Sequence, residues 1–170
     1  KSVTTENLLL GDKNAVLMAA RITGFGADYS VALTCPSCDN TWDEQVDLGA
    51  VEPKLTAEIT DGVTLLENGN YEMTFSEYDG LTIEVRLLRG RDERNIVSRR
   101  EKKRKMKLPD SLITDQLGMI ITRVNEITDP RLLKDFVGRC PTRISREIRT
   151  RYEELVPDID LSVDMECDTC

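Results

Sequence analysis

The chain has 170 residues and a net charge of −8, with 39% hydrophobic and 32% charged residues, which suffices for one hydrophobic core or two small ones. No apolar run approaches the roughly 20 residues of a membrane-spanning helix, so we expect a soluble, intracellular-type protein with no membrane partner. The sequence contains no histidine, which removes the usual general base, Ser–His and Cys–His nucleophile pairs and histidine-containing metal sites. An enzyme acting on a small-molecule substrate is therefore the weakest functional class.

The charge is divided unevenly along the chain. Residues 1–85 carry 4 basic and 15 acidic side chains, residues 86–151 carry 19 and 9, and residues 152–170 carry none and 7. Such segregation indicates segments that dock on one another or that face different partners. The net negative charge argues against non-specific binding to phosphate backbones, so nucleic acid is an unlikely partner.

The first half of the chain predicts one helix followed by strands. A helix with one buried face is expected from Asp12 to about Ile22, because its apolar residues recur every three or four positions. Alternating apolar and polar residues predict the strands that follow. These cover residues 29–34 and 42–48, 63–66 after a connection, and 71–75 and 81–87 as a hairpin around Asp79-Gly80.

The second half predicts mainly helices. The polar stretch 91–107 indicates a solvated helix or a flexible arm, and apolar residues spaced by three and four predict a helix over 113–127. Two shorter helices are expected over 132–137 and 144–155, and residues 159–165 alternate as a strand does.

Four cysteines form two CxxC pairs, each at the end of a predicted strand: Cys35, Cys38, Cys167 and Cys170. A two-residue spacer lets both thiolates of a pair face one cation, and two such pairs complete a tetrahedron around Zn²⁺. We therefore predict one structural Zn²⁺ per chain, since four thiolates leave no open coordination position. A disulfide or redox pair and an iron–sulfur cluster are the alternatives. The fifth cysteine, Cys140, is interpreted as a small buried side chain.

A run of basic residues is the second candidate site, for partner binding. It comprises Arg99, Arg100, Lys102, Lys103, Arg104, Lys105 and Lys107. We consider three interpretations of this run: it forms an exposed helix face, it docks on an acidic protein surface, or it contacts nucleic acid. No aromatic residue interleaves the run, so base stacking has no support.

These patterns together predict an α+β fold. A zinc-ribbon-like β module would form from the N- and C-terminal strands, with an inserted β-hairpin and a helical segment. The expected divisions are 1–88 with the first cysteine pair, a basic helical insertion over 89–157, and 158–170 with the second pair, packing back on 28–48.

The order of these motifs resembles the baseplate hub family of T-even-type contractile-tailed bacteriophages. The resemblance rests on Gly11-Asp12, the CPSC and CDTC pairs, the hairpin 81–88, the helical middle and Asp158-Ile159-Asp160-Leu161. It implies a non-enzymatic protein of the virion tail baseplate, assembled in the host cytoplasm, with other baseplate and tail proteins as partners. It also implies that the four paired cysteines are metal ligands. The alternatives are a hub assembly chaperone absent from the mature virion and a nucleic-acid-binding zinc-ribbon protein.

Overall fold

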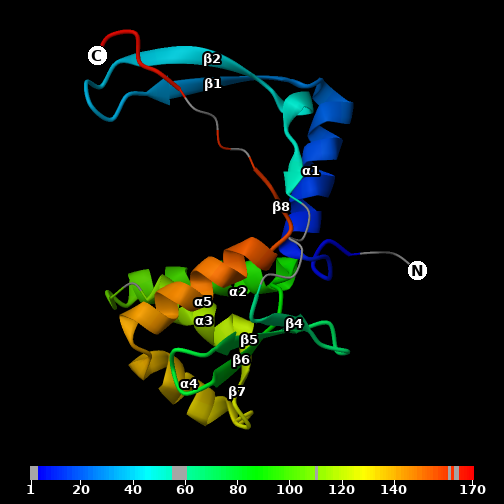
Figure 1. Ribbon diagram of the computed structural model, residues 1–170. Coiled ribbons are helices and arrows are strands. Elements are labelled where there is room, and N and C mark those ends of the chain that lie inside the picture. Colours follow the sequence, from blue (N-terminus) through cyan, green and yellow to red (C-terminus); the bar gives the residue numbers. More distant parts are fainter. Residues whose placement is uncertain (1–3, 55–60, 110, 161, 163–164) are drawn as a thin grey trace. The chain divides into compact units, whose positions relative to one another are not determined.

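The computed structural model describes residues 4–54, 61–109, 111–160, 162 and 165–170 (Figure 1). It divides the chain into two compact units. The core unit comprises Lys1–Leu10 and Thr56–Val156, and the cysteine unit comprises Gly11–Leu55 and Pro157–Cys170. Both units contain helix and strand, so the predicted α+β class is confirmed. The predicted boundaries at residues 88 and 157 stay predictions.

The core unit contains an antiparallel four-stranded sheet. Its strands are β4 (Val63–Leu65), β5 (Tyr71–Phe75), β6 (Leu81–Val85) and β7 (Ile121–Val124), in the order β4-β5-β6-β7 (Figure 1). The predicted hairpin is confirmed: β5 pairs with β6 through a turn in which Asp79 and Gly80 have φ of 50° and 71°. Two consecutive positive φ angles define a turn that matches the twist of paired strands, and aspartate and glycine adopt them most readily.

Four helices accompany the sheet: α2 (Gly90–Lys105), α3 (Leu112–Ile120), α4 (Pro130–Arg139) and α5 (Thr142–Leu155). The helices expected over 132–137 and 144–155 are thereby confirmed, and of the two possibilities for 91–107, a solvated helix or a flexible arm, the structure shows the helix. One apolar face of α5 is buried and belongs to the same hydrophobic core as the sheet. That core includes Ile148, Tyr152 and Leu155 from α5 and Met73, Phe75, Ile83 and Val85 from the strands.

The single helix predicted over 113–127 is wrong. Helix α3 ends at Ile120, and the next four residues form β7, which pairs with β6 through Ile121↔Val85 and Val124↔Ile83. The free edge of β6 offers backbone groups that a strand can satisfy, and β-branched residues fit a pleated sheet surface. Sheet pairing therefore overrides a helical spacing that continues along the sequence.

Glu84 of β6 lies in a buried polar network. Its carboxylate accepts hydrogen bonds from Asn70 Nδ2 at 2.6 Å, Asn68 Nδ2 at 3.1 Å and Arg123 Nε at 2.9 Å. Arg123 also pairs with Glu72 at 2.6 Å. Burial raises the pKa of Glu84, but the hydrogen bonds from Asn70, Arg123 and Asn68 outweigh it and lower the pKa to about 2.

The cysteine unit is built from two separate chain segments. The first supplies α1 (Leu10–Phe25, from Gly11 onward), β1 (Asp28–Thr34), β2 (Thr41–Asp47), the 3₁₀ turn η1 (Leu48–Ala50) and β3 (Pro53–Lys54), and the second supplies β8 (Asp158–Ile159). Strands β1 and β2 form the expected antiparallel pair, with Thr34 opposite Thr41. The segments meet where a Cβ on Gly11 would lie 1.7 Å from the Pro157 carbonyl oxygen, so only glycine fits there.

Two expectations for the cysteine unit are wrong. Gly11 is the one buried residue of α1, and Ala15 and Ala19 are exposed, so the helix does not bury the predicted face. In the described part of the C-terminal segment only Asp158–Ile159 is strand, whereas residues 159–165 were expected; residues 161, 163 and 164 lie outside the described residues. Strand β8 pairs with β3 rather than with β1 or β2, so a zinc-ribbon-like arrangement is not established.

We expect Glu84→Gln to weaken the pH dependence of stability in acid. The folded-state pKa of Glu84 lies at about 2, below its ordinary value of 4.5, so its contribution is complete above about pH 4.5 and is lost as pH falls toward 2. Urea unfolding should show a steeper fall for the native chain than for Glu84→Gln across this window. At pH 7 the variant should be less stable by about 1–3 kcal/mol.

Glu67→Gln is the matched control, because Glu67 is an exposed carboxylate in the loop between β4 and β5. It should follow the native curve. Identical acid profiles for Glu84→Gln and the native chain would contradict the assignment.

Candidate metal centre

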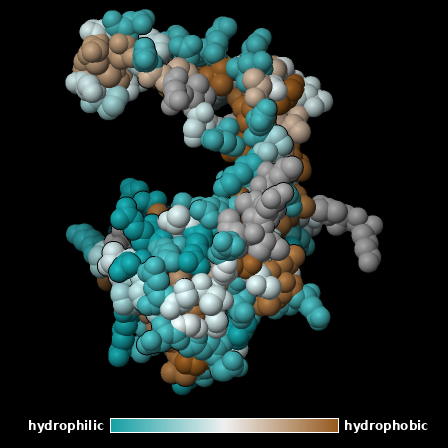
Figure 2. All heavy atoms as spheres, viewed as in Figure 1, coloured by the Kyte–Doolittle hydropathy of each residue, from teal (hydrophilic) through white to brown (hydrophobic). Residues whose placement is uncertain are grey.

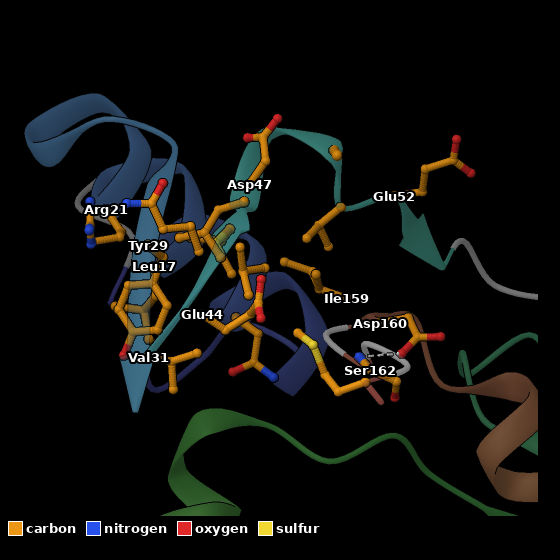
Figure 3. Close-up of a pocket in the computed structure, with 18 of the residues that line it drawn as sticks. Leu17, Arg21, Tyr29, Val31, Glu44, Asp47, Glu52, Ile159, Asp160 and Ser162 are labelled. Carbon is orange, nitrogen blue, oxygen red and sulfur yellow. Dashed lines mark hydrogen bonds between the residues drawn. The ribbon is translucent and has the colours of Figure 1, made fainter. Parts of the chain in front are cut away.

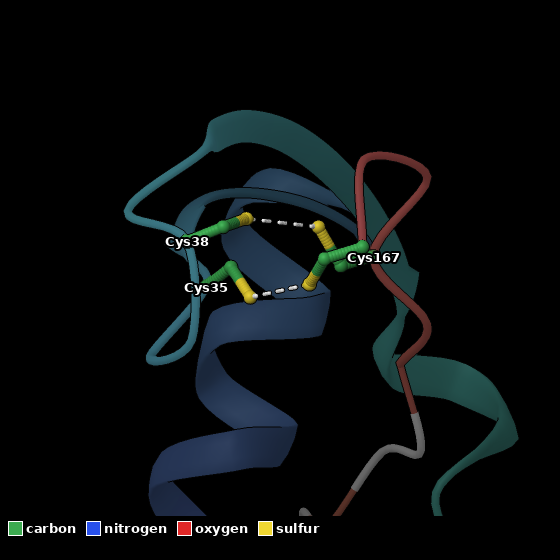
Figure 4. A group of neighbouring side chains, drawn as sticks. Cys35, Cys38 and Cys167 are labelled. Atoms are coloured by element: carbon green, nitrogen blue, oxygen red, sulfur yellow. Dashed lines mark hydrogen bonds between the residues drawn. The ribbon is translucent and has the colours of Figure 1, made fainter.

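The structure brings together the four cysteines that the sequence singled out. Cys35 and Cys38 lie in the turn between β1 and β2, and Cys167 and Cys170 lie at the C-terminal end of the cysteine unit (Figure 4). All four Sγ atoms lie within 4.8 Å of one another. A run of 128 residues separates Cys38 from Cys167 in the sequence, so the cluster depends on folding.

The sulfur spacing is compatible with a metal site. The Sγ atoms of Cys35 and Cys170 are 3.7 Å apart, as are those of Cys38 and Cys167 (Figure 4). A disulfide requires about 2.05 Å, and all five cysteines are free. A tetrahedron with metal–sulfur bonds of about 2.3 Å has edges of about 3.8 Å. The donor set therefore fits one tetrahedral cation held by four thiolates.

The first cysteine turn is held by backbone hydrogen bonds. The amide of Cys35 donates to the Asn40 carbonyl at 2.9 Å, and the amide of Asp39 donates to the Cys35 carbonyl at 3.0 Å. Asp39 has a φ of 57°, in the left-handed region that aspartate tolerates better than most residues. The turn closes tightly enough for both of its sulfurs to face the second pair.

Backbone amides favour the thiolate form of one cysteine in each pair. Hydrogen bonds from the amides of Ser37 and Cys38 lower the pKa of the Cys35 thiol. The Thr169 amide, with a smaller contribution from that of Cys170, lowers the pKa of Cys167 to about 6. Each turn thus presents one sulfur that ionises readily, which is what a metal ligand requires.

Cys170 behaves in the opposite way. Its hydrogen bonds with the sulfurs of Cys38, Cys35 and Cys167 raise its pKa to about 12. The Cys170 thiol therefore favours its protonated form, and binding of a cation by all four sulfurs would release that proton. Four sulfur ligands would fill a tetrahedral shell, leaving no coordination position for a substrate.

The basic residues of the second candidate site lie on α2 and just beyond its end. Lys103 is half-buried; its Nζ donates to Asp115 Oδ2 at 2.5 Å and also to Ser111 Oγ. The other six, Arg99, Arg100, Lys102, Arg104, Lys105 and Lys107, are exposed. The structure thus places the run on the surface, and its partner-binding role stays a prediction.

Cys140 lies apart from the cluster and is half-buried against the hydrophobic core, close to the buried position expected. Burial raises the pKa of its thiol, so it is not activated as a nucleophile.

An apolar groove in the cysteine unit is the feature that sequence reasoning missed. It has a volume of about 1260 Å³ and is lined by α1, β1, β2 and residues around β8 (Figure 3). Met18 of the predicted buried face of α1 lines this groove, together with Leu17, which was not predicted to be part of that face and is 54% exposed. Apolar spacing identifies a helix face but not what covers that face.

Comparison with known proteins adds the decisive observation: the sequence matches the T4 bacteriophage base plate protein family over residues 1–170. The chain belongs to that family. The base plate family supports a structural role, a location in the virion tail and contacts with other tail proteins. No curated protein and no solved structure gives a match. Among the described residues no helix is long and apolar enough to cross a membrane.

We expect the four-thiol cluster of this base plate protein to bind one divalent cation per chain. Co²⁺ added to the metal-stripped, reduced protein should produce thiolate-to-cobalt charge-transfer absorption that saturates at one equivalent, and Zn²⁺ should displace it. Cys167→Ser should lose most of this absorption because it removes one of four ligands.

Cys140→Ser is the control, because it also removes one thiol but lies outside the cluster. It should bind Co²⁺ as the native chain does. Equal absorption from Cys167→Ser and Cys140→Ser would overturn the assignment of the ligands.

Proposed function

We propose that this chain is a structural, non-catalytic component of the hub region of a contractile phage tail baseplate. It would be held there by contacts with other tail proteins and stabilised by one Zn²⁺ on Cys35, Cys38, Cys167 and Cys170. The observation that carries the proposal is the family match across residues 1–170. The placing in the hub region rests on the resemblance of the motif order described above.

The choice of Zn²⁺ rests on the donor set. Four thiolates in a tetrahedral arrangement are typical of structural zinc sites, and cytosolic assembly disfavours structural disulfides. The ion would tie the C-terminal segment to the β1–β2 turn of the cysteine unit. An isolated two-stranded hairpin is only marginally stable in water, so this cross-link would supply much of the local stability.

The non-catalytic role is supported by how the shifted carboxylates are used. The pKa of Asp92 is lowered by its hydrogen bonds with Arg86, at 2.8 and 3.0 Å, and Asp92 also accepts from the Arg89 amide at the start of α2. Glu84 lies in the sheet network of the core unit. The carboxylates of Asp92 and Glu84 form ion pairs, and Asp92 also accepts a hydrogen bond at the start of α2. These interactions stabilise the fold, and neither carboxylate is placed to transfer protons to a substrate.

The test is the composition of the particle. Quantitative mass spectrometry of purified virions of the encoding phage should find the chain in a fixed ratio to the other baseplate proteins, with zinc in proportion. A phage carrying Cys167→Ser should assemble fewer complete tails, because the cysteine unit folds poorly without the metal cross-link between its two segments. One carrying Cys140→Ser should assemble normally.

Two results would overturn the proposal. A chain required for tail assembly but missing from mature virions would be an assembly chaperone. Tight binding of the purified protein to DNA with a steep salt dependence would favour a nucleic-acid-binding protein instead. Normal tails from Cys167→Ser would remove the structural role of the metal while leaving the place in the baseplate intact.

A further inference from the structure

The groove of the cysteine unit presents apolar side chains to solvent. We call it the α1 groove; its apolar lining includes Leu17, Met18, Tyr29, Val31, Leu33, Val46, Leu48, Val51, Ile159 and Met165. Leu17, Tyr29 and Met165 are 54%, 44% and 38% exposed. Figure 2 shows brown, apolar side chains gathered where α1 lies. An exposed apolar concavity of this kind is typical of a protein interaction site.

The rim of the α1 groove is acidic. Its lining carries four carboxylates, on Glu44, Asp47, Glu52 and Asp160 (Figure 3). Arg21 is the one cation in that lining, and its guanidinium donates to the carbonyls of Gly26 and Asp28 at 2.9 and 3.3 Å and stacks on Phe25 and Tyr29. The cysteine unit as a whole has 12 acidic and 3 basic residues. The groove therefore suits an apolar partner surface that carries positive charge.

The same chain carries such a surface where α2 meets α3. Lys103 near the end of α2 pairs with Ser111 and Asp115 at the start of α3, which holds the two helix ends together. Around this junction Met106, Leu108, Leu112 and Ile113 are 70%, 51%, 40% and 46% exposed. Arg104, Lys105 and Lys107 beside them are also exposed. We call these seven residues the α2–α3 tip.

We propose that the α1 groove of one copy of the chain binds the α2–α3 tip of a second copy. The apolar residues of groove and tip supply the buried area, and the carboxylates of the rim face the cations of the tip. Apolar burial provides most of the free energy of such a contact, while charge pairing sets the register and speeds association. The basic run that the sequence marked for partner binding thereby contributes Arg104, Lys105 and Lys107 to the contact.

This contact joins two different surfaces, so it is heterologous. A copy that uses its groove for one neighbour keeps its tip for another, and the contact repeats into a closed ring or an open chain. Self-association of this kind goes beyond the proposed place in the baseplate, because it specifies that copies of the chain contact one another. It does not depend on which other tail proteins are present.

Sedimentation velocity of the full chain tests the proposal through charge reversal. The native protein should self-associate as concentration rises and dissociate as salt rises, because the charge pairs at the interface are screened. A groove variant, Leu17→Lys with Glu52→Lys, and a tip variant, Arg104→Glu with Lys105→Glu, should each weaken association at least tenfold. Both pairs of residues are exposed, so folding should be unaffected.

Two matched control variants carry the same kinds of substitution, with the same change in net charge, at exposed positions outside the groove and the tip. Val16→Lys with Asp43→Lys places two lysines on exposed positions of α1 and β2 outside the groove lining. Arg131→Glu with Arg146→Glu reverses two exposed charges of α4 and α5 away from the tip. Both controls should associate as the native chain does.

Mixing the two damaged variants gives the sharpest outcome. The groove variant keeps an intact tip and the tip variant keeps an intact groove, so an equimolar mixture should form a mixed dimer although each variant alone stays monomeric. A mixed dimer from two variants that are each monomeric is the result expected when the groove of one copy binds the tip of another. Absence of that dimer overturns the proposal.

Photocrosslinking identifies the occupant directly. When p-benzoylphenylalanine replaces Leu17 in the otherwise native chain, it should crosslink to the peptide around residues 104–113 of a second copy. Mixing ¹⁵N-labelled with unlabelled copies should give crosslinks of mixed isotope, which only two chains can produce. A monomer at every concentration, or crosslinks within one chain alone, would overturn binding by a second copy.

Discussion

The topology of this chain depends on one constraint: the segment that carries Cys167 and Cys170 must pack against the much earlier segment that carries Cys35 and Cys38. The cysteine unit consists of Gly11–Leu55 and Pro157–Cys170, and the greater part of the core unit is the chain between them. Several contacts join the two segments, among them the close approach of Gly11 to Pro157, the pairing of β3 with β8, the hydrogen bond from Asn14 to Asp158 and the four sulfurs. Closing so long a loop costs conformational entropy, which these contacts together offset.

The two units achieve stability by different means. The core unit buries a continuous hydrophobic cluster that includes α5 and the sheet, and it places Glu84 and Arg123 in a satisfied polar network. Among its described apolar residues, the cysteine unit buries Cys35 and Leu48 and leaves the rest half-buried or exposed. A unit with so few buried side chains needs cross-links or partners to hold its shape, which is the situation in which small domains use metals. The close cluster of four cysteines and the apolar groove both accompany this small buried core.

Charge is divided between the units in the same way. The cysteine unit has 12 acidic and 3 basic residues, whereas the core unit has 19 and 20. The charges that are segregated along the sequence are therefore also divided between the units. The cysteine unit is acidic, and the core unit is nearly neutral overall but has basic residues at the end of α2. Such surfaces orient a protein among neighbours through many small contacts, which is what a part of a large assembly requires.

The sequence alone determined the features that depend on neighbouring residues. The hairpin turn at Asp79-Gly80, the helices α4 and α5 and the CxxC spacing were all predicted, because turn chemistry and side-chain period act within a few residues. For the polar stretch that forms α2, the sequence left a helix and a flexible arm open. The four cysteines were identified as one group from their spacing, and the fold brought their sulfurs within 4.8 Å. The order of the motifs also indicated a resemblance to phage baseplate proteins, which agrees with the match to the base plate family over residues 1–170.

Only the tertiary structure decided what depends on distant partners. Residues 121–124 continue the helical spacing of α3 but form β7, because the edge of β6 supplies hydrogen-bond partners that no local pattern reveals. Helix α1 has the period of a core helix, yet Ala15 and Ala19 of the predicted buried face are exposed, and Leu17 and Met18 line the groove. Strand β8 pairs with β3, far away in the sequence, and not with β1 or β2 as was expected. Burial and pairing depend on contacts between residues far apart in the chain, and periodicity carries no information about them.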